Sequence, residues 1–193
     1  MTISYGDWQA YPWKNELDTQ SKRVAMHYTE LLSKDFEGAH SPMHMIERAI
    51  VLAAFSIRRM FEKRLVTDKL RGEEITVRMF ENNTSGDFRP PYKGRSGGEA
   101  FRSYNFKTAG TERLKINDLA NEIIHSSQFM FVSNEAMIPN GLLIASDRHL
   151  KARLLHLSIE EFSAVAQRVL DDRVRIAGDS WNPKTGEISA TRE

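Results

Sequence analysis

The chain has 193 residues, of which 40% are apolar and 27% charged, and its net charge at pH 7 is +1. This length and apolar content predict one globular domain with a full hydrophobic core, and they exclude a disordered chain. The balanced charge argues against a generally basic nucleic-acid coat, and the absence of cysteine excludes disulfides, cysteine nucleophiles and cysteine-ligated metal sites.

No targeting or membrane segment is expected. The first residues lack a basic segment followed by an apolar run, and the longest apolar stretch, residues 49–55, is far shorter than the ~20 residues of a membrane span. We therefore expect a cytoplasmic protein that does not contact a membrane.

The first half of the chain predicts two helices. Residues 1–14 carry four aromatic rings without a clear period, so an irregular segment packed on the body is expected there. Apolar residues then recur at helical spacing over residues 15–36. Ser41 and Gly72 suit the start and end of a second helix, which predicts one long central helix over about 41–71. Its first half is apolar on nearly all sides, as in a buried helix. Its second half has a basic face, which is expected to be solvated and to form i, i+4 ion pairs, with a phosphate-binding face as the alternative.

The second half of the chain predicts strands between two further helices. Residues 74–80 alternate as in a strand, and residues 82–110 form a long loop rich in Gly and Pro. A helix is expected from about Glu112 to Ser126. The later elements are a strand (127–132), a turn (139–141), a hairpin of two strands (142–146 and 151–157), a capped helix (159–174) and a polar tail from about 178 that frays, with Trp181 as a docking candidate.

These elements predict a single α+β domain over residues 1–193. Strands that follow one another closely in sequence usually pair antiparallel. A helical layer around the long central helix (about 41–71) is therefore expected to pack on a small, mainly antiparallel sheet.

The helix end near His125 is the first candidate site. Asp118, Asn121 and His125 are spaced to share one helical face. A histidine beside polar groups can act as a general acid or base, with Asn121 orienting it. The alternative is that His125 only caps the helix, where its charge favours the C-terminal dipole.

The residues from Arg113 to Ser126, with Leu119-Ala120-Asn121-Glu122-Ile123-Ile124-His125 at their centre, resemble the signature helix of the HEPN superfamily. Those domains are all-helical, and many are metal-independent ribonucleases of toxin–antitoxin and phage-defence systems. Their motif places an arginine four to six residues before a histidine. His125 matches the histidine, but Leu119, Ala120 and Asn121 stand where the arginine belongs, and three predicted strands follow. The resemblance implies a member that has kept binding without catalysis.

The long loop is the second candidate site, because it interleaves aromatic rings with cations. Such a surface binds single-stranded nucleic acid, since cations contact phosphates and rings stack on bases. The alternative is a surface loop whose rings hold it to the body. The expected binding residues are Arg89, Tyr92, Lys93, Arg95, Arg102, Tyr104 and Lys107.

No cofactor or metal site is predicted. His44 and Glu47 are one helical turn apart, but His40 lies before the predicted helix start, so a three-ligand site is not favoured. His149 and His156 are expected at the surface. No nucleophile elbow, phosphate-binding loop or paired carboxylate motif is present in the sequence.

Two functions follow from this sequence. The first is a non-enzymatic binding or assembly protein of a bacterial cell, from a mobile or defence-related element, with a homodimer as one arrangement and another protein as the alternative partner. The second is a HEPN-like protein that binds single-stranded nucleic acid or cleaves RNA with His125. The incomplete arginine–histidine motif favours the first.

Overall fold

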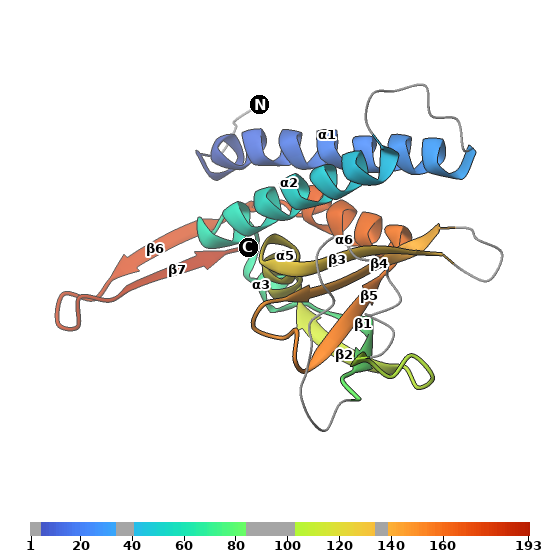
Figure 1. Ribbon diagram of the computed structural model, residues 1–193. Helices are drawn as coiled ribbons and strands as arrows, with labels where there is room; N and C mark the ends of the chain where they lie inside the picture. Colours follow the sequence, from blue (N-terminus) through green and yellow to red (C-terminus); the bar gives the residue numbers. More distant parts are fainter. Residues whose placement is uncertain (1–4, 34–40, 84–102, 134–138) are drawn as a thin grey trace.

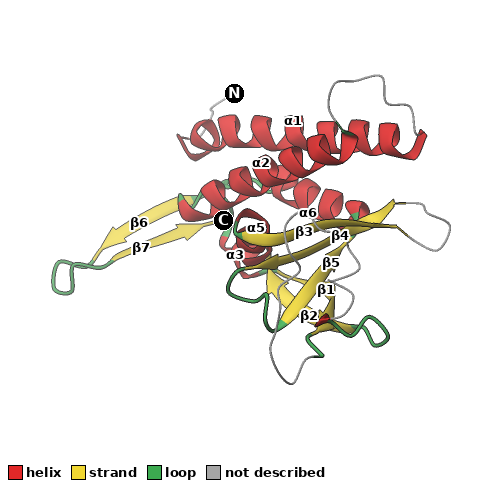
Figure 2. Ribbon diagram, in the orientation of Figure 1, coloured by secondary structure: helices red, strands yellow, loops and turns green. Residues whose placement is uncertain are grey.

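The computed structural model describes residues 5–33, 41–83, 103–133 and 139–193. The helices are α1 (Tyr5–Ser33), α2 (Pro42–Glu62), α3 (Asp68–Gly72), α5 (Ile116–Ile124) and α6 (Ile159–Asp171). The strands are β1 (Glu74–Glu81), β2 (Gly110–Lys115), β3 (Ser126–Ser133), β4 (Pro139–Ser146), β5 (Arg153–Leu157), β6 (Ala177–Trp181) and β7 (Ile188–Arg192). The predicted α+β class is confirmed (Figure 2).

Five strands form one antiparallel sheet in the order β2-β1-β5-β4-β3. The register places Met79 and Ile144 on either side of Leu155. Strands β6 and β7 form a separate two-stranded ribbon, which projects from the body beside the end of α2 (Figure 1). We call this ribbon, residues 177–192, the arm.

Helices cover one face of the sheet in two layers. Helices α1 and α2 pack on each other on the outside, and α5 and α6 both contact α2 and strand β4 (Figure 1). The main core lies between these layers and includes Ile50, Leu119 and Leu155, all at most 2% exposed. A smaller core, with Phe80, Tyr104 and Leu143, lies on the opposite face of the sheet.

Helix α1 begins at Tyr5, so the irregular segment expected over residues 1–14 is wrong for its described part. Ala10, Trp13 and Leu17 are spaced by three and four residues, and they continue the stripe that packs on the core. Pro12 lies inside α1, at its eighth residue, where the missing N–H removes one helical hydrogen bond.

Helix α2 ends at Glu62, so the single helix predicted over about 41–71 is wrong beyond that point. Its end has a Schellman arrangement, in which the N–H of Leu65 donates to the carbonyl of Met60 (2.8 Å) and the N–H of Arg64 to that of Phe61 (3.2 Å). Arg64 has the left-handed φ of +52° that this motif requires. The chain resumes as α3 after Thr67, whose hydroxyl accepts from the N–H of Leu70.

Three other local predictions are corrected. Residues 110–115 form strand β2, so the helix expected from about Glu112 begins only at Ile116. Residues 139–141 are the start of β4 and not a turn, with Gly141 at φ +136° against the backbone of Leu157. The tail from about 178 forms the arm, and Trp181 does not dock but stays 66% exposed.

The remaining elements match their predictions. Strands β1 and β3, the antiparallel β4–β5 hairpin and α6 lie where the sequence places them, within a few residues. Ser158 and Glu161 form the predicted capping box at the start of α6.

Candidate functional site

The three residues predicted around His125 lie together at the end of α5. His125 is the C-cap of this helix, and its N–H donates to the carbonyl of Asn121 at 3.0 Å. The His125 ring and Asp118 are exposed, whereas Asn121 is half-buried. Within the described chain the Asn121 side chain makes no hydrogen bond to the His125 ring, so it does not orient that ring here. His125 therefore lies at the C-cap of α5, as in the capping alternative.

The His125 ring instead contacts an arginine from another helix. The Nη1 atom of Arg58, on α2, lies 3.0 Å from Nε2 of His125. A guanidinium can only donate, so Nε2 is the acceptor, and this places the ring proton of a neutral His125 on Nδ1. A neutral imidazole beside a fixed cation has the composition needed for proton transfer next to a phosphate.

Glu62 balances the charge of this cluster. It accepts from Nε of Arg58 at 2.7 Å and from Nη1 of Arg59 at 2.9 Å. The hydrogen bond from Arg58 is the main reason that the pKa of Glu62 lies below its ordinary value. Arg59 also lies over the ring of Trp13, 5.8 Å from its centre. The i, i+4 pairing predicted for the basic face of this helix is therefore confirmed by Arg58 and Glu62.

A second, buried polar network lies at the turn between β4 and β5. Glu122, on α5, is 5% exposed and accepts hydrogen bonds from the N–H of Ser146 (3.0 Å) and from Nδ1 of His149. Arg153, 6% exposed, donates to Glu122 at 3.4 Å and pairs closely with Glu112. Burial opposes the charged form of Glu122, but these donors outweigh it and hold the pKa of Glu122 below its ordinary value.

This network has a structural role in placing the β4–β5 turn. The Tyr104 hydroxyl donates to the carbonyl of Leu150, and the Asn82 amide donates to that of Lys151 (2.6 Å). Turn residues 147–152 are thus held by contacts from α5, from Asn82 just after β1, and from the segment before β2. The expected surface position of His156 is wrong, because this side chain is 7% exposed on β5. Burial, followed by the charge of Arg78, lowers the pKa of His156.

Most of the predicted nucleic-acid residues lie outside the described residues. Arg89, Tyr92, Lys93, Arg95 and Arg102 all fall in the range 84–102. Of the remaining two, Lys107 is exposed, whereas the ring of Tyr104 is 1% exposed and has no open face on which a base could stack.

The described residues add no third ligand to the metal site considered for His44 and Glu47. Both side chains are exposed on α2, and His40 lies outside the described residues. Among the residues that the structure describes, no three His, Asp or Glu side chains are grouped so that they could hold a metal ion. No helix in the described part of the chain is long and apolar enough to span a bilayer.

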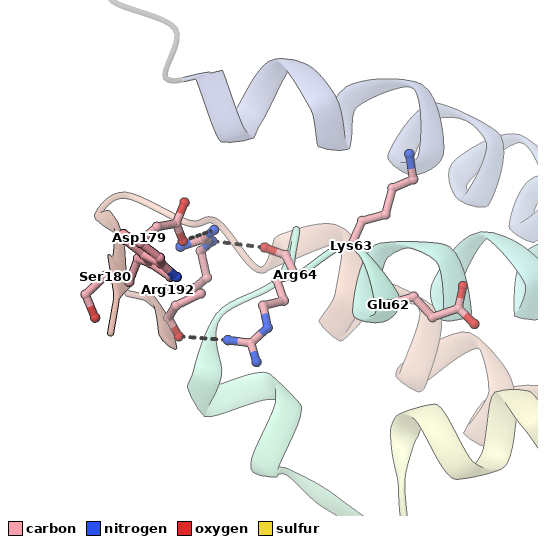
Figure 3. A pocket seen from close by; sticks show the side chains of 8 residues that line it. Glu62, Lys63, Arg64, Asp179, Ser180 and Arg192 are labelled. Carbon is pink, nitrogen blue, oxygen red and sulfur yellow. Dashed lines mark hydrogen bonds and ion pairs between the residues drawn. The ribbon is translucent and has the colours of Figure 1, made fainter. Parts of the chain in front are cut away.

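The arm is an exposed feature that shares a cleft with Glu62 of the His125 cluster. Every side chain of β6 is exposed. An open cleft of about 560 Å³ separates the arm from the end of α2 (Figure 3). It is lined by Glu62, Lys63, Arg64, Asp179, Ser180, Trp181, Ala190 and Arg192.

Reciprocal hydrogen bonds hold the arm at its base. Nη1 of Arg64 donates to the carbonyl of Ala190 (3.0 Å), and Nε of Arg192 donates to the carbonyl of Arg64 (3.2 Å). The Arg192 side chain also pairs with Asp179 at 2.8 Å, and its backbone N–H donates to Asp68 at 2.9 Å. In Figure 3 the Arg64 side chain points toward the arm, whereas Lys63 and Glu62 point away from it.

Sequence reasoning missed the contact between Arg58 and His125, and it missed the arm. Arg58 lies 67 residues from His125 in the chain, and nothing local in the sequence connects them. The arm has a weak signal, since the sequence Asn182-Pro183-Lys184-Thr185-Gly186 is rich in turn residues between two short segments. Comparison with protein families, with curated proteins and with solved structures found no match for this chain.

Proposed function

We propose that this chain is a non-enzymatic binding or assembly protein of a bacterial cell, and that it contacts its protein partner through the arm. The observation that carries the proposal is the exposure of the arm, where Trp181 is 66% exposed and the whole of β6 faces solvent. An isolated two-stranded ribbon is marginally stable in water, and tryptophan is enriched in protein interfaces.

The charges of the arm favour a protein partner over a nucleic acid. Lys184 and Arg192 are balanced by Asp179 and Glu187 within residues 177–192, so the arm carries no net charge. Binding to a phosphate backbone depends on an excess of cations, which the arm lacks. A neutral ribbon with an exposed indole is the usual composition of a protein contact surface.

Site-specific photo-crosslinking in the cell of origin tests this proposal. A photoreactive amino acid at position 181 is expected to give one adduct of defined mass, because the partner lies on this side chain. The matched control carries the same group at Ala164, an exposed position on α6 away from the arm. Equal adducts from both positions, or none from position 181, would contradict the proposal.

A ribonuclease is the second candidate, and the contact between Arg58 and His125 favours it. In this alternative Arg58 holds the phosphate and His125 transfers the proton, so the cation comes from α2 and not from the helix of the histidine. The 3.0 Å separation of the two side chains supports this pairing.

Cleavage of labelled single-stranded RNA and DNA at low and moderate salt separates the two functions. The assembly proposal predicts no cleavage by the wild type, and a stability loss of about 0.5–2 kcal/mol in His125→Ala, because the side-chain contact with Arg58 at the end of α5 is lost while the backbone bond to Asn121 remains. The control is His44→Ala, which removes an exposed histidine from α2. Cleavage that His125→Ala loses and His44→Ala keeps would replace the assembly function by the nuclease.

A further inference from the structure

The outer edge of β6 is an unpaired strand edge. Asp179 lies directly opposite Ala190 in the ribbon, and the Ala190 carbonyl points away from β6 to accept from Arg64. Residues directly opposite in an antiparallel pair direct their backbone groups alike, so the N–H and C=O of Asp179 point away from β7. Within the described sheets β7 is the one neighbour of β6.

The two edges of the arm differ. The body occupies the outer edge of β7, since Arg64 bonds to Ala190 and Asp68 to the N–H of Arg192. The β6 edge lacks two of the usual protections, because residues 177–181 contain no proline and no lysine, and Asp179 is their one charged residue. Such an edge is a template for another strand.

We propose that β6 pairs with β6 of a second copy of this chain, so that two arms form one four-stranded antiparallel sheet. This inference rests on the proposed function of the arm as an assembly contact. Two identical strands related by a two-fold axis pair antiparallel, and the pairing is centred on one residue. The sequence of β6 and its neighbours selects that residue.

Charge excludes a centre at Asp179 and favours one at Gly178. A two-fold axis at Asp179 would place two carboxylates directly opposite each other, which destabilises a sheet. An axis at Gly178 places each Asp179 opposite Ala177 of the partner subunit, and the outward backbone groups of both residues then meet as a hydrogen-bonded pair. Continued two residues before the start of β6, the same register brings Trp181 beside Arg175 of the partner subunit.

Trp181 and Arg175 are both exposed in the single chain, and this register brings them together. The indole of Trp181 and the guanidinium of Arg175 meet twice in the dimer, once on each side of the axis, as cation–π pairs. Ile176, 61% exposed, lies opposite Ser180 of the partner subunit and loses solvent contact as well. The partner is therefore recognised by backbone pairing, with these side chains fixing the register.

Disulfide trapping tests the register, and the chain suits it because it contains no cysteine. In Gly178→Cys the two introduced thiols face each other across the axis at a non-hydrogen-bonded position, where Cα atoms lie about 4.5 Å apart. A Cβ added at Gly178 meets no atom within 4 Å, so the variant is expected to fold. Mild oxidation should give a covalent dimer at least tenfold faster than for Asp179→Cys or Thr185→Cys.

Sedimentation measures the same contact without cysteine. The wild type should reach twice its 22.1 kDa mass with rising concentration, and Trp181→Ser should weaken self-association at least tenfold. A wild type that stays monomeric, or cross-linking of Asp179→Cys as fast as that of Gly178→Cys, would overturn the inference. An adduct between position 181 and a different protein in the cell would also overturn it, but would leave the proposed assembly function standing.

Discussion

The environment of Glu122 favours its charged form. Its carboxylate is buried, with donors from Ser146, His149 and Arg153. Glu122→Gln should lower the free energy of unfolding at pH 7 by about 3 kcal/mol, because it leaves Arg153 with less compensation in the interior. Thermal unfolding of the two proteins measures this difference.

The stability difference between the wild type and Glu122→Gln is expected to decrease as the pH falls. The pKa of Glu122 is lowered in the folded chain, so its contribution is complete above the ordinary value of 4.5 and is lost as the pH falls through the lowered pKa. The gap between wild type and Glu122→Gln should therefore close in acid. Asp118→Asn, which neutralises an exposed carboxylate on the same helix, is the matched control. A gap that stays constant below pH 4.5 would show that the lost charge is not its cause.

At the scale of residues, the sequence identified one half of the His125 cluster. The end of a helix and the spacing of Asn121 and His125 are local properties, so both could be predicted. The partner Arg58 could not, because its contact depends on how α2 crosses α5. Asn121 does not have the orienting role predicted for it, since its side-chain amide is not hydrogen-bonded to the His125 ring.

At the scale of elements, local signals decided what was predictable. The capping box at Ser158 and the alternation over 74–80 act within a few residues, and both elements lie where expected. Strand β2 was missed because its sequence, GTERLK, has a single large apolar residue, Leu114, and so shows no alternation of apolar and polar residues. Pairing with β1, as in Val77 opposite Glu112, decides in favour of the strand.

The end of α2 was missed for a related reason. Arg64 is not glycine, so nothing marked it as a helix stop, and the basic pattern continues to Arg71. The stop is made by tertiary structure, since Leu65 and Val66 are buried and must leave the helical path to reach the core. Arg64 adopts the left-handed conformation, and its side chain is then placed to bond the arm.

At the scale of the molecule, Arg64 connects the helical layer to the arm. Its guanidinium donates to the carbonyl of Ala190 and its carbonyl accepts from the side chain of Arg192, both on β7, and Asp68 accepts from the backbone N–H of Arg192. The direction in which the arm projects is thus set by the turn between α2 and α3 (Figure 1). An assembly surface on the arm needs this direction to be fixed, because a mobile ribbon would lose conformational entropy on binding.

Arg64→Gly and Arg64→Ala separate the two roles of this residue. Both variants remove the bond to Ala190, so hydrogen exchange across residues 177–192 should be faster in each than in the wild type. Only glycine relieves the positive φ, so the body of Arg64→Gly should be more stable than that of Arg64→Ala by on the order of 1 kcal/mol in thermal unfolding. The exchange of β4 and β5, which belong to the five-stranded sheet, serves as the internal control. Unchanged exchange of the arm in both variants would mean that Arg192 and Asp68 alone hold it, and that the α2 turn does not set its direction.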